Sequence, residues 1–428
     1  MNRITHPYRI ILLVWLAWIL ILVGFQNLVQ ARFQPERPDF VLSWTPSETT
    51  PTSQNDKPYL IEPFMNAQVS WDSEYYLSIA VGGYDDPRMR AVSPDYTGAN
   101  GLVALKSQQP GWTSMNYAFF PAYPLAMRLA ALPLRLLGLN PIATATLAGV
   151  LVSALGTLLG MLCLYVLVRD ELGEAGGLRA AFFLLIFPTG FFLAQVYTEG
   201  LFVGLAFSSL VMMRRKSWLG AAVLSTLTIF TRPNGLAILL PLFWSLGYDA
   251  WIRWHSADPD AVPRRPWRIL LNLAWGLIPV AAFLAWKVSP PGRAFSTVQA
   301  LFFGSAPFHL ISSLWAWKDS FMLLFGDNPQ TRIYYAIEFA AILLALVSIG
   351  LTLRKQPDLA LFGLGIIGIA LTSGAPLALH RYVLAVPSLF LLLGRWGKHP
   401  VFERAWTVLS LLVMCLLAAV FTFDMFAG

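Results

Sequence analysis

The sequence contains few charged residues: they make up 12% of its 428 positions, whereas a soluble globular domain carries about 25%. Hydrophobic residues account for 57%, and the mean hydropathy is +0.60. This composition excludes an ordinary soluble domain. Several apolar runs approach the roughly 20 residues that a helix needs to cross a bilayer. The sequence therefore predicts an all-α polytopic membrane protein.

Cysteine and the common catalytic motifs are equally scarce. The two cysteines, Cys163 and Cys415, both lie in apolar runs, so neither a disulfide framework nor a cysteine metal site is expected. The motifs GxxxxGK[ST], HExxH and CxxC are absent, and nucleotide-driven transport and zinc chemistry lack their usual signals. Asp85 and Asp86 are adjacent and do not form a DxD pair. We therefore expect neither a metal nor another cofactor.

The net charge of +7 is unevenly distributed. Residues 32–117 carry 10 acidic and 6 basic side chains, which leaves 24 basic and 13 acidic ones elsewhere. The basic residues stand at the ends of apolar runs, which is the positive-inside pattern of membrane proteins. A nucleic-acid partner is therefore not expected.

The same rule orients the chain. Arg3 and Arg9 precede the first apolar run, so the N-terminus is predicted to be cytoplasmic and the following polar segment extracytoplasmic. Residues 29–31 (VQA) resemble a signal-peptidase site, and a cleaved signal is the alternative. Segment 118–138 contains three prolines and two arginines, which favours a re-entrant or interfacial segment. A full crossing there would give twelve spans and contradict the charge rule for much of the chain.

These considerations predict three regions and about eleven spans. Residues 1–31 form the first transmembrane helix. Residues 32–140 form a large extracytoplasmic catalytic loop with short helices and the segment 118–138. Residues 141–428 form the helix bundle. The expected spans are 10–30, 141–168, 179–196, 199–213, 217–231, 235–249, 268–288, 331–353, 358–374, 381–395 and 404–424.

Five polar clusters fall near the predicted outer ends of spans. Ionisable residues at membrane depth usually face a cavity or a charged partner, so the clusters predict one shared site. They are Asp72, the FFPAYP segment 119–124, residues 197–199 (YTE), residues 231–235 (TRPNG) and residues 380–382 (HRY).

Each cluster also has a structural interpretation. Asp72 is a suitable N-cap for a helix that begins near Ser73. Glu199 could complement a helix dipole, and the two arginines, Arg232 and Arg381, could extend to lipid headgroups. His380 could be a hydrogen-bonded packing residue.

Read in order, these motifs resemble the GPI mannosyltransferase II (PIG-V-like) family of the GT-C superfamily, over nearly the whole chain. The matching stretches are WDSEYYLSIAVGGY, NYAFFPAYPLAMRL, QVYTEGLF, TRPNG and HRYVLAVPSLF. The resemblance implies a GT-C-like fold, a catalytic carboxylate in the first outer loop and a polyprenyl-phosphate sugar donor. The chain is short and its end shows no ER retrieval signal, so we expect a prokaryotic relative whose acceptor need not be a GPI lipid.

This interpretation assigns roles to the clusters. Asp72 is expected to be the general base, because a carboxylate can accept the proton of the acceptor hydroxyl. Arg232 and Arg381, helped by His380, are expected to bind the donor phosphate. Direct attack would invert the anomeric configuration. The expected substrate pocket comprises Trp71, Glu74, Tyr76, Phe120, Pro121, Tyr123, Tyr197, Glu199, Asn234 and Tyr382.

The leading hypothesis is thus an inverting glycosyltransferase in a prokaryotic cell membrane, with its active site on the extracytoplasmic side. Its expected partners are a polyprenyl-phosphate sugar, which the resemblance implies to be mannose, a lipid or glycan acceptor, and membrane lipids. A transporter or flippase of a lipid-linked sugar is the alternative, and a non-catalytic assembly subunit is a third reading. The long polar loop with Asp72 favours the enzyme.

Overall fold

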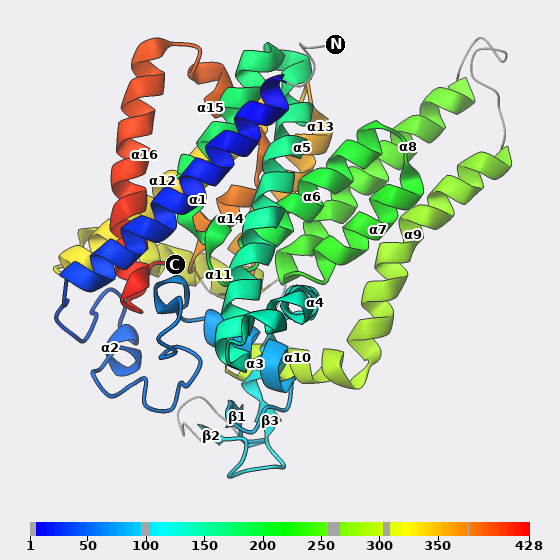
Figure 1. Cartoon of the computed structure of the whole chain (residues 1–428). Helices are drawn as coiled ribbons and strands as arrows, with labels where there is room; N and C mark the ends of the chain where they lie inside the picture. Colours follow the sequence, from blue (N-terminus) through cyan, green and yellow to red (C-terminus); the bar gives the residue numbers. More distant parts are fainter. Residues whose placement is uncertain (1–5, 96–102, 256–265, 303–308, 375) are drawn as a thin grey trace.

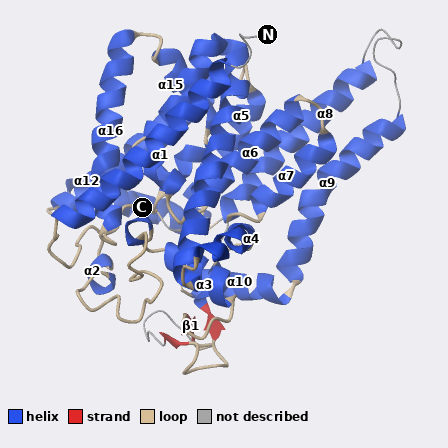
Figure 2. Ribbon diagram, viewed as in Figure 1, coloured by secondary structure: helices blue, strands red, loops and turns tan. Residues whose placement is uncertain are grey.

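The computed structural model describes residues 6–95, 103–255, 266–302, 309–374 and 376–428. Helices fill the molecule, and the few strands lie outside the helix bundle (Figure 2). Within the described residues, six helices are long and apolar enough to cross a membrane. This confirms the all-α membrane class, whereas the expected total of eleven spans is not confirmed. The six are His6–Arg32, Pro141–Ile186, Pro233–His255, Ile269–Val288, Pro329–Thr352 and Pro400–Thr422.

The bundle contains these long helices and several shorter ones (Figure 1). Its helices are α1 (His6–Arg32), α5 (Pro141–Ile186), α6 (Glu199–Arg214), α7 (Trp218–Ile229), α8 (Leu239–His255), α9 (Pro266–Val288), α10 (Pro290–Leu301), α11 (Leu310–Met322), α12 (Pro329–Thr352), α13 (Pro357–Leu371), α14 (Leu379–Tyr382), α15 (Pro387–Trp396) and α16 (Pro400–Thr422). Short 3-10 turns include η4 (Gly190–Ala194), η5 (Pro233–Ile238), η6 (Leu323–Phe325) and η7 (Val383–Ala385).

Two of the expected spans are interrupted in the structure, each at a residue that precedes a proline. The second part of α5, beyond a kink at Gly173 (φ +72°), ends at Ile186 and not at 196. Phe187 precedes Pro188 and is extended (ψ 147°), because a proline ring disfavours helical ψ at the preceding residue. The expected span 381–395 is likewise divided, since Val386 before Pro387 leaves the helical region. The division places Arg381 in a short, irregular segment.

The loop 32–140 contains small elements. Its helices are α2 (Thr45–Glu48), η1 (Asn66–Gln68), α3 (Ser73–Gly82), η2 (Met115–Ala118), α4 (Ala122–Leu134) and η3 (Arg135–Leu137). A three-stranded antiparallel sheet, in the order β2-β1-β3, was not expected. It consists of β1 (Arg90–Val92), β2 (Val103–Leu105) and β3 (Thr113–Ser114). Such short strands give no usable alternation of polar and apolar residues.

Segment 118–138 is mostly the single helix α4. Its 13 residues correspond to roughly 20 Å, which is shorter than the ~30 Å hydrocarbon core. This length agrees with a segment that does not cross the membrane. Its re-entrant or interfacial position remains a prediction.

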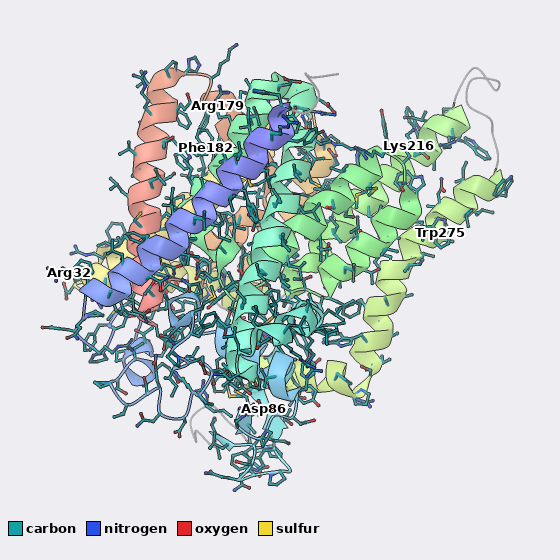
Figure 3. The ribbon with its side chains drawn as sticks, viewed as in Figure 1. Arg32, Asp86, Arg179, Phe182, Lys216 and Trp275 are labelled. Atoms are coloured by element: carbon teal, nitrogen blue, oxygen red, sulfur yellow. The ribbon has the colours of Figure 1, made fainter. Side chains whose placement is uncertain are left out.

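The loop 32–140 and several basic residues at the ends of apolar runs lie at opposite ends of the bundle. Figure 3 shows Arg179 and Lys216 at one end and Asp86, in the loop, at the other. Arg214, the last residue of α6, contacts Gln356 and Asp358, which lie where α12 ends and α13 begins. These ends of α6, α12 and α13 therefore lie at the same level as Lys216. The positive-inside rule also predicts that the basic stretch 253–268 is cytoplasmic, and residues 256–265 of this stretch lie outside the described residues. The arrangement fits the predicted topology, and the identity of the cytoplasmic end remains a prediction.

Close packing of α5 against α6 positions the N-terminus of α6. A Cβ on Gly200 would lie 2.1 Å from the backbone oxygen of Ser153, and one on Gly204 would lie 2.4 Å from that of Gly156. Small residues at these positions let the two backbones touch, as is common between membrane helices. Glu199, the first residue of α6, is thereby fixed deep in the protein.

Candidate active site

Asp72 lies immediately before α3, at the position of a helix cap. Its side chain nevertheless makes no capping hydrogen bond. Its backbone N–H donates to the hydroxyl of Tyr197, with an N–O distance of 3.2 Å. The preceding residue, Trp71, has a φ of +48°, which is uncommon for a residue other than glycine. The side chain of Asp72 is therefore available for another partner.

That partner is Arg381. Its Nη1 and Nη2 atoms both donate to Oδ2 of Asp72, at 3.4 Å each. The Nε atom of Arg381 lies 3.0 Å from Oε1 of Glu199, and Nη1 of Arg232 donates to the same oxygen at 2.8 Å. Two carboxylates and two guanidinium groups thus form one continuous charge cluster. We call these four residues the charge cluster below.

The charge cluster is formally neutral, which explains how it is tolerated at this depth. The side chains of Glu199 and Arg381 are only 2% and 7% exposed, and an unpaired buried charge would be costly. Asp72 is 29% exposed and is the most accessible member. Both arginines point inward and pair with Glu199, so neither extends to headgroups as the structural interpretation proposed.

Among the described residues, a buried carboxylate oxygen of the charge cluster, Oε2 of Glu199, has no hydrogen-bond partner. The side-chain nitrogen of Asn234, a predicted pocket residue close in sequence to Arg232, is also buried without a described partner. Buried polar groups are nearly always hydrogen-bonded in folded proteins. These two atoms therefore mark places where a ligand or water can be accommodated.

Aromatic rings flank both guanidinium groups. The ring of Tyr382 lies 4.5 Å from Cζ of Arg232 and 5.5 Å from that of Arg381. Arg381 is also 5.1 Å from the ring of Tyr197 and 5.3 Å from that of Phe192. Such cation–π contacts stabilise a cation without neutralising it. The arrangement therefore keeps positive charge available for an anionic ligand.

His380 is placed differently from its arginine neighbour. Its Nδ1 contacts Oε2 of Glu338, and its Nε2 lies 2.9 Å from the backbone oxygen of Ala427. Glu338 also accepts the backbone N–H groups of Leu379 and His380, at 2.7 and 2.9 Å. Both ring nitrogens are thus occupied, and contact with a phosphate would require one of these bonds to break. The expected helper role of His380 remains a prediction.

Three further predicted pocket residues, Tyr76, Tyr123 and Glu74, have different surroundings. Tyr76 lies close to the charge cluster, with its ring edge-on to Tyr197 (6.2 Å) and to Tyr123 (5.2 Å). Tyr123 is a packing residue, because its buried hydroxyl bonds Ser153 at 2.9 Å. Glu74 is buried and lies 3.7 Å from Arg90, within the loop.

The FFPAYP segment reaches the site through its backbone. The N–H of Ala122, which follows Pro121 at the start of α4, donates to the backbone oxygen of Phe230 at 2.9 Å, next to the TRPNG segment. The ring of Phe120 packs against that of Trp286 of α9, with centroids 4.8 Å apart. The structure therefore brings all five polar clusters together, with Phe120 and Glu74 at the periphery.

Burial raises the pKa of the Asp72 carboxyl above its ordinary value, and the positive charge of Arg381 opposes this shift. The carboxylate form is consequently a stronger base than a solvated aspartate. A raised pKa is a common property of groups that transfer protons in catalysis.

Two carboxylates support the site from positions that the sequence did not assign to it. Oδ1 of Asp424, beyond α16, accepts the hydroxyl of Ser70 at 2.8 Å and the N–H of Trp71 at 3.1 Å. Glu338 of α12 accepts backbone N–H groups of the segment that carries Arg381 and so positions this segment. A lone acid in the apolar run of α12 is a recognisable signal. Asp424 gives no such signal, because it follows a span like any loop residue.

No three histidine, cysteine or acidic side chains gather as a metal-ligand set within the described ranges. Asp86 of the adjacent pair is buried and bonds Ser78 at 3.1 Å, while Asp85 is exposed and accepts from Tyr117 at 2.9 Å.

Comparisons with known proteins show distant similarity to mannosyltransferases. The chain is 27% identical over 234 residues to GPI alpha-1,6-mannosyltransferase 2 of Mus musculus, which covers 54% of this chain and 40% of that protein. It is 30% identical over 181 residues to the Cricetulus griseus protein of the same name, covering 41% and 31%. The chain thus matches less than half the length of these relatives. No family model matches.

Two solved structures are similar in backbone. The Archaeoglobus fulgidus oligosaccharyltransferase, tethered to an acceptor peptide, aligns with 97% of this chain and 55% of its own, at 13% identity and a TM-score of 0.42. ArnT from Cupriavidus metallidurans, bound to undecaprenyl phosphate, aligns with 94% and 71%, at 15% identity and a TM-score of 0.43. The sequence matches to GPI alpha-1,6-mannosyltransferase 2 confirm the predicted resemblance of this chain to the PIG-V-like family.

Proposed function

We propose that this protein is an inverting glycosyltransferase that moves mannose from a polyprenyl-phosphate donor to a hydroxyl of a lipid or glycan acceptor. We place the reaction at the extracytoplasmic face of the membrane. The observation that carries the proposal is the charge cluster, in which the partly exposed Asp72 pairs with the buried Arg381, and Glu199 joins Arg381 to the buried Arg232. The names of the curated relatives support mannose as the sugar.

The charge cluster contains the groups that this reaction requires. The acceptor oxygen attacks the anomeric carbon while its proton passes to Asp72, which acts as general base. The bond between the anomeric carbon and the phosphate oxygen breaks, and its electron pair leaves with the lipid phosphate. Arg232 and Arg381 stabilise the negative charge that develops on this leaving group. Attack opposite the leaving group inverts the configuration, as from a β-linked donor to an α-linked product.

Phosphate binding and base activation are coupled in this scheme. The contact of Arg381 with Asp72, at 3.4 Å, is the longest in the charge cluster, whereas the contacts with Glu199 are 2.8 and 3.0 Å. A phosphate that approaches Arg381 should therefore displace Asp72 first. The displaced carboxylate loses its cationic partner and becomes a stronger base for the acceptor.

The same geometry argues against the transporter alternative. A lipid-linked sugar that crosses the membrane needs polar groups along its path. The charged groups of the candidate site lie instead at the end of the bundle that carries the loop, where Asp72 contacts Arg381 and Asp424 contacts Trp71. A single reaction site at one face fits this distribution better.

The direct test incubates purified protein with polyprenyl-phosphate-mannose and a membrane lipid extract, followed by mass spectrometry. A new product that is one hexose heavier, and absent with Asp72→Asn, supports the proposal. Movement of the labelled donor between the leaflets of proteoliposomes, with no new product, would instead establish the transporter.

A further inference from the structure

Three aromatic rings meet beside Asp72. Trp44, Trp71 and Phe426 contact one another in pairs, with ring centroids 5.6, 5.2 and 5.5 Å apart and interplanar angles of 90°, 76° and 90°. They come from the loop before α2, the residue before Asp72 and the segment after α16. We call these three residues the aromatic corner.

The aromatic corner is partly open to solvent. Trp44 is 39% exposed, and the other two rings are half-buried. One side of the corner is charged, because the ammonium of Lys57 lies 5.9 Å from the ring of Trp71 and pairs with Glu48 at 2.9 Å. On another side, Phe426 packs against the buried cluster of Val41, Leu42, Tyr334 and Tyr335. The exposed ring of Trp44 is therefore the part of the corner that a ligand can reach.

The fold maintains an unfavourable backbone conformation to place Trp71 here. A tryptophan at φ +48° is strained, and such strain concentrates at functional sites. The carboxylate of Asp424 stabilises the conformation by accepting the N–H of Trp71. The indole N–H of Trp71 has no hydrogen-bond partner within the described part of the chain. The strained backbone of Trp71 is explained if the corner is organised for a ligand.

We propose that the aromatic corner is a binding subsite for a pyranose ring, with Trp44 as its exposed platform. The face of an indole carries negative charge density, and the C–H groups on the apolar face of a pyranose present positive edges to it. The perpendicular rings of Trp71 and Phe426 hold Trp44 in place. The subsite adjoins the base, so the bound ring belongs to the donor sugar or to an acceptor glycan. Pyranose binding itself does not depend on the proposed function. Only the assignment of the bound ring to the donor sugar or to the acceptor glycan rests on it.

The test compares Trp44→Ala, Trp44→Leu and Trp44→Phe in the full chain in nanodiscs. Leucine retains apolar bulk without a flat ring, whereas phenylalanine retains the ring. Trp251→Ala is the matched control, because Trp251 is 57% exposed and lies on α8, whose C-terminal part is joined to the opposite end through the Asp249–Lys216 pair. Two measurements are made: KM for polyprenyl-phosphate-mannose and for the lipid extract, and saturation-transfer NMR of methyl α-D-mannopyranoside.

We expect the alanine and leucine variants to raise one KM by about five- to tenfold, with phenylalanine close to wild type. A rise in the donor KM assigns the donor sugar to the corner, and a rise for the extract assigns the acceptor. Equal behaviour of Trp44→Leu and wild type would overturn the proposal. If the wild type transfers no sugar, the proposed function fails, and the NMR experiment alone decides the subsite. Loss of the saturation-transfer signal only in the alanine and leucine variants supports the subsite, whereas equal signals in all proteins reject it.

Discussion

Arg381 donates from both of its terminal nitrogens to a single oxygen of Asp72, although the two residues are 309 positions apart in the sequence. Each contact is 3.4 Å, which is long for a charge-assisted bond. The same guanidinium approaches Glu199 more closely. We therefore expect the pair to separate when an anionic substrate binds.

Replacement of Asp72 by asparagine should abolish transfer without unfolding the protein. The amide has the same size but cannot accept the acceptor's proton, and loss of a general base removes about 10²–10⁴ of rate. The side chain makes no capping bond that the substitution could weaken. Initial rates and thermal unfolding in detergent would measure both effects.

The matched control for this variant is Asp56→Asn, an exposed position in the same loop. Glu74→Gln should also be milder than Asp72→Asn, because Glu74 faces Arg90 and not the charge cluster. Turnover of Asp72→Asn within a few-fold of wild type would remove Asp72 from the mechanism.

Arg381→Lys should weaken donor binding although it keeps the positive charge. A lysine cannot contact Asp72 and Glu199 through a planar fork, and a lost charge-assisted hydrogen bond costs about 1.5–3 kcal/mol, or roughly 10- to 150-fold. We expect this loss in kcat/KM for the donor, both for Arg381→Lys and for Arg232→Ala. The exposed Arg135→Lys serves as the control. Near-normal donor kinetics in both variants would refute the phosphate-binding assignment.

The pH dependence should report the environment of Asp72. Its pKa is raised by burial, so activity should fall on acidification at a pH above the ordinary range of an aspartate, as the base becomes protonated. Arg381 opposes the shift, and Arg381→Gln should therefore move the acidic limb of kcat/KM to higher pH. A limb that stays in place, or moves to lower pH, would contradict this electrostatic coupling.

Glu338→Gln should impair turnover more than folding. The carboxylate accepts the backbone N–H groups of Leu379 and His380 as well as contacting the imidazole, and these bonds orient the segment that carries Arg381. An amide retains only one oxygen acceptor for these donors. We expect a reduced kcat and a displaced acidic limb, measured against the exposed control Glu174→Gln. An unchanged pH profile with a lowered Tm would show a purely structural role.

The predicted topology can be tested by thiol labelling in intact cells. In a background in which Cys163 and Cys415 are serine, an impermeant reagent should label Asn55→Cys in the loop. It should not label Glu174→Cys, which is near Arg179 at the other end of the bundle (Figure 3). The reverse pattern would invert the orientation and place the charge cluster on the cytoplasmic side.

The membrane class and the positions of the polar clusters could be predicted from the sequence alone. Both follow from local quantities, namely the length of apolar runs and the charges at their ends. Only the order of the motifs indicated the resemblance to a family. The helix breaks before Pro188 and Pro387 were also readable in principle, since a proline restricts the residue that precedes it.

Tertiary structure alone decided which charges pair. Arg232 and Arg381 share one oxygen of Glu199, Glu338 holds the segment of His380, and Trp44 meets Trp71. These contacts join segments that are distant in the chain, and no local pattern encodes their geometry. Their partners are set by the packing of the bundle, as where Gly200 lets α6 approach α5 and fixes the depth of Glu199. At that depth a charge is stable only if another segment supplies its partner, and the fold determines that segment.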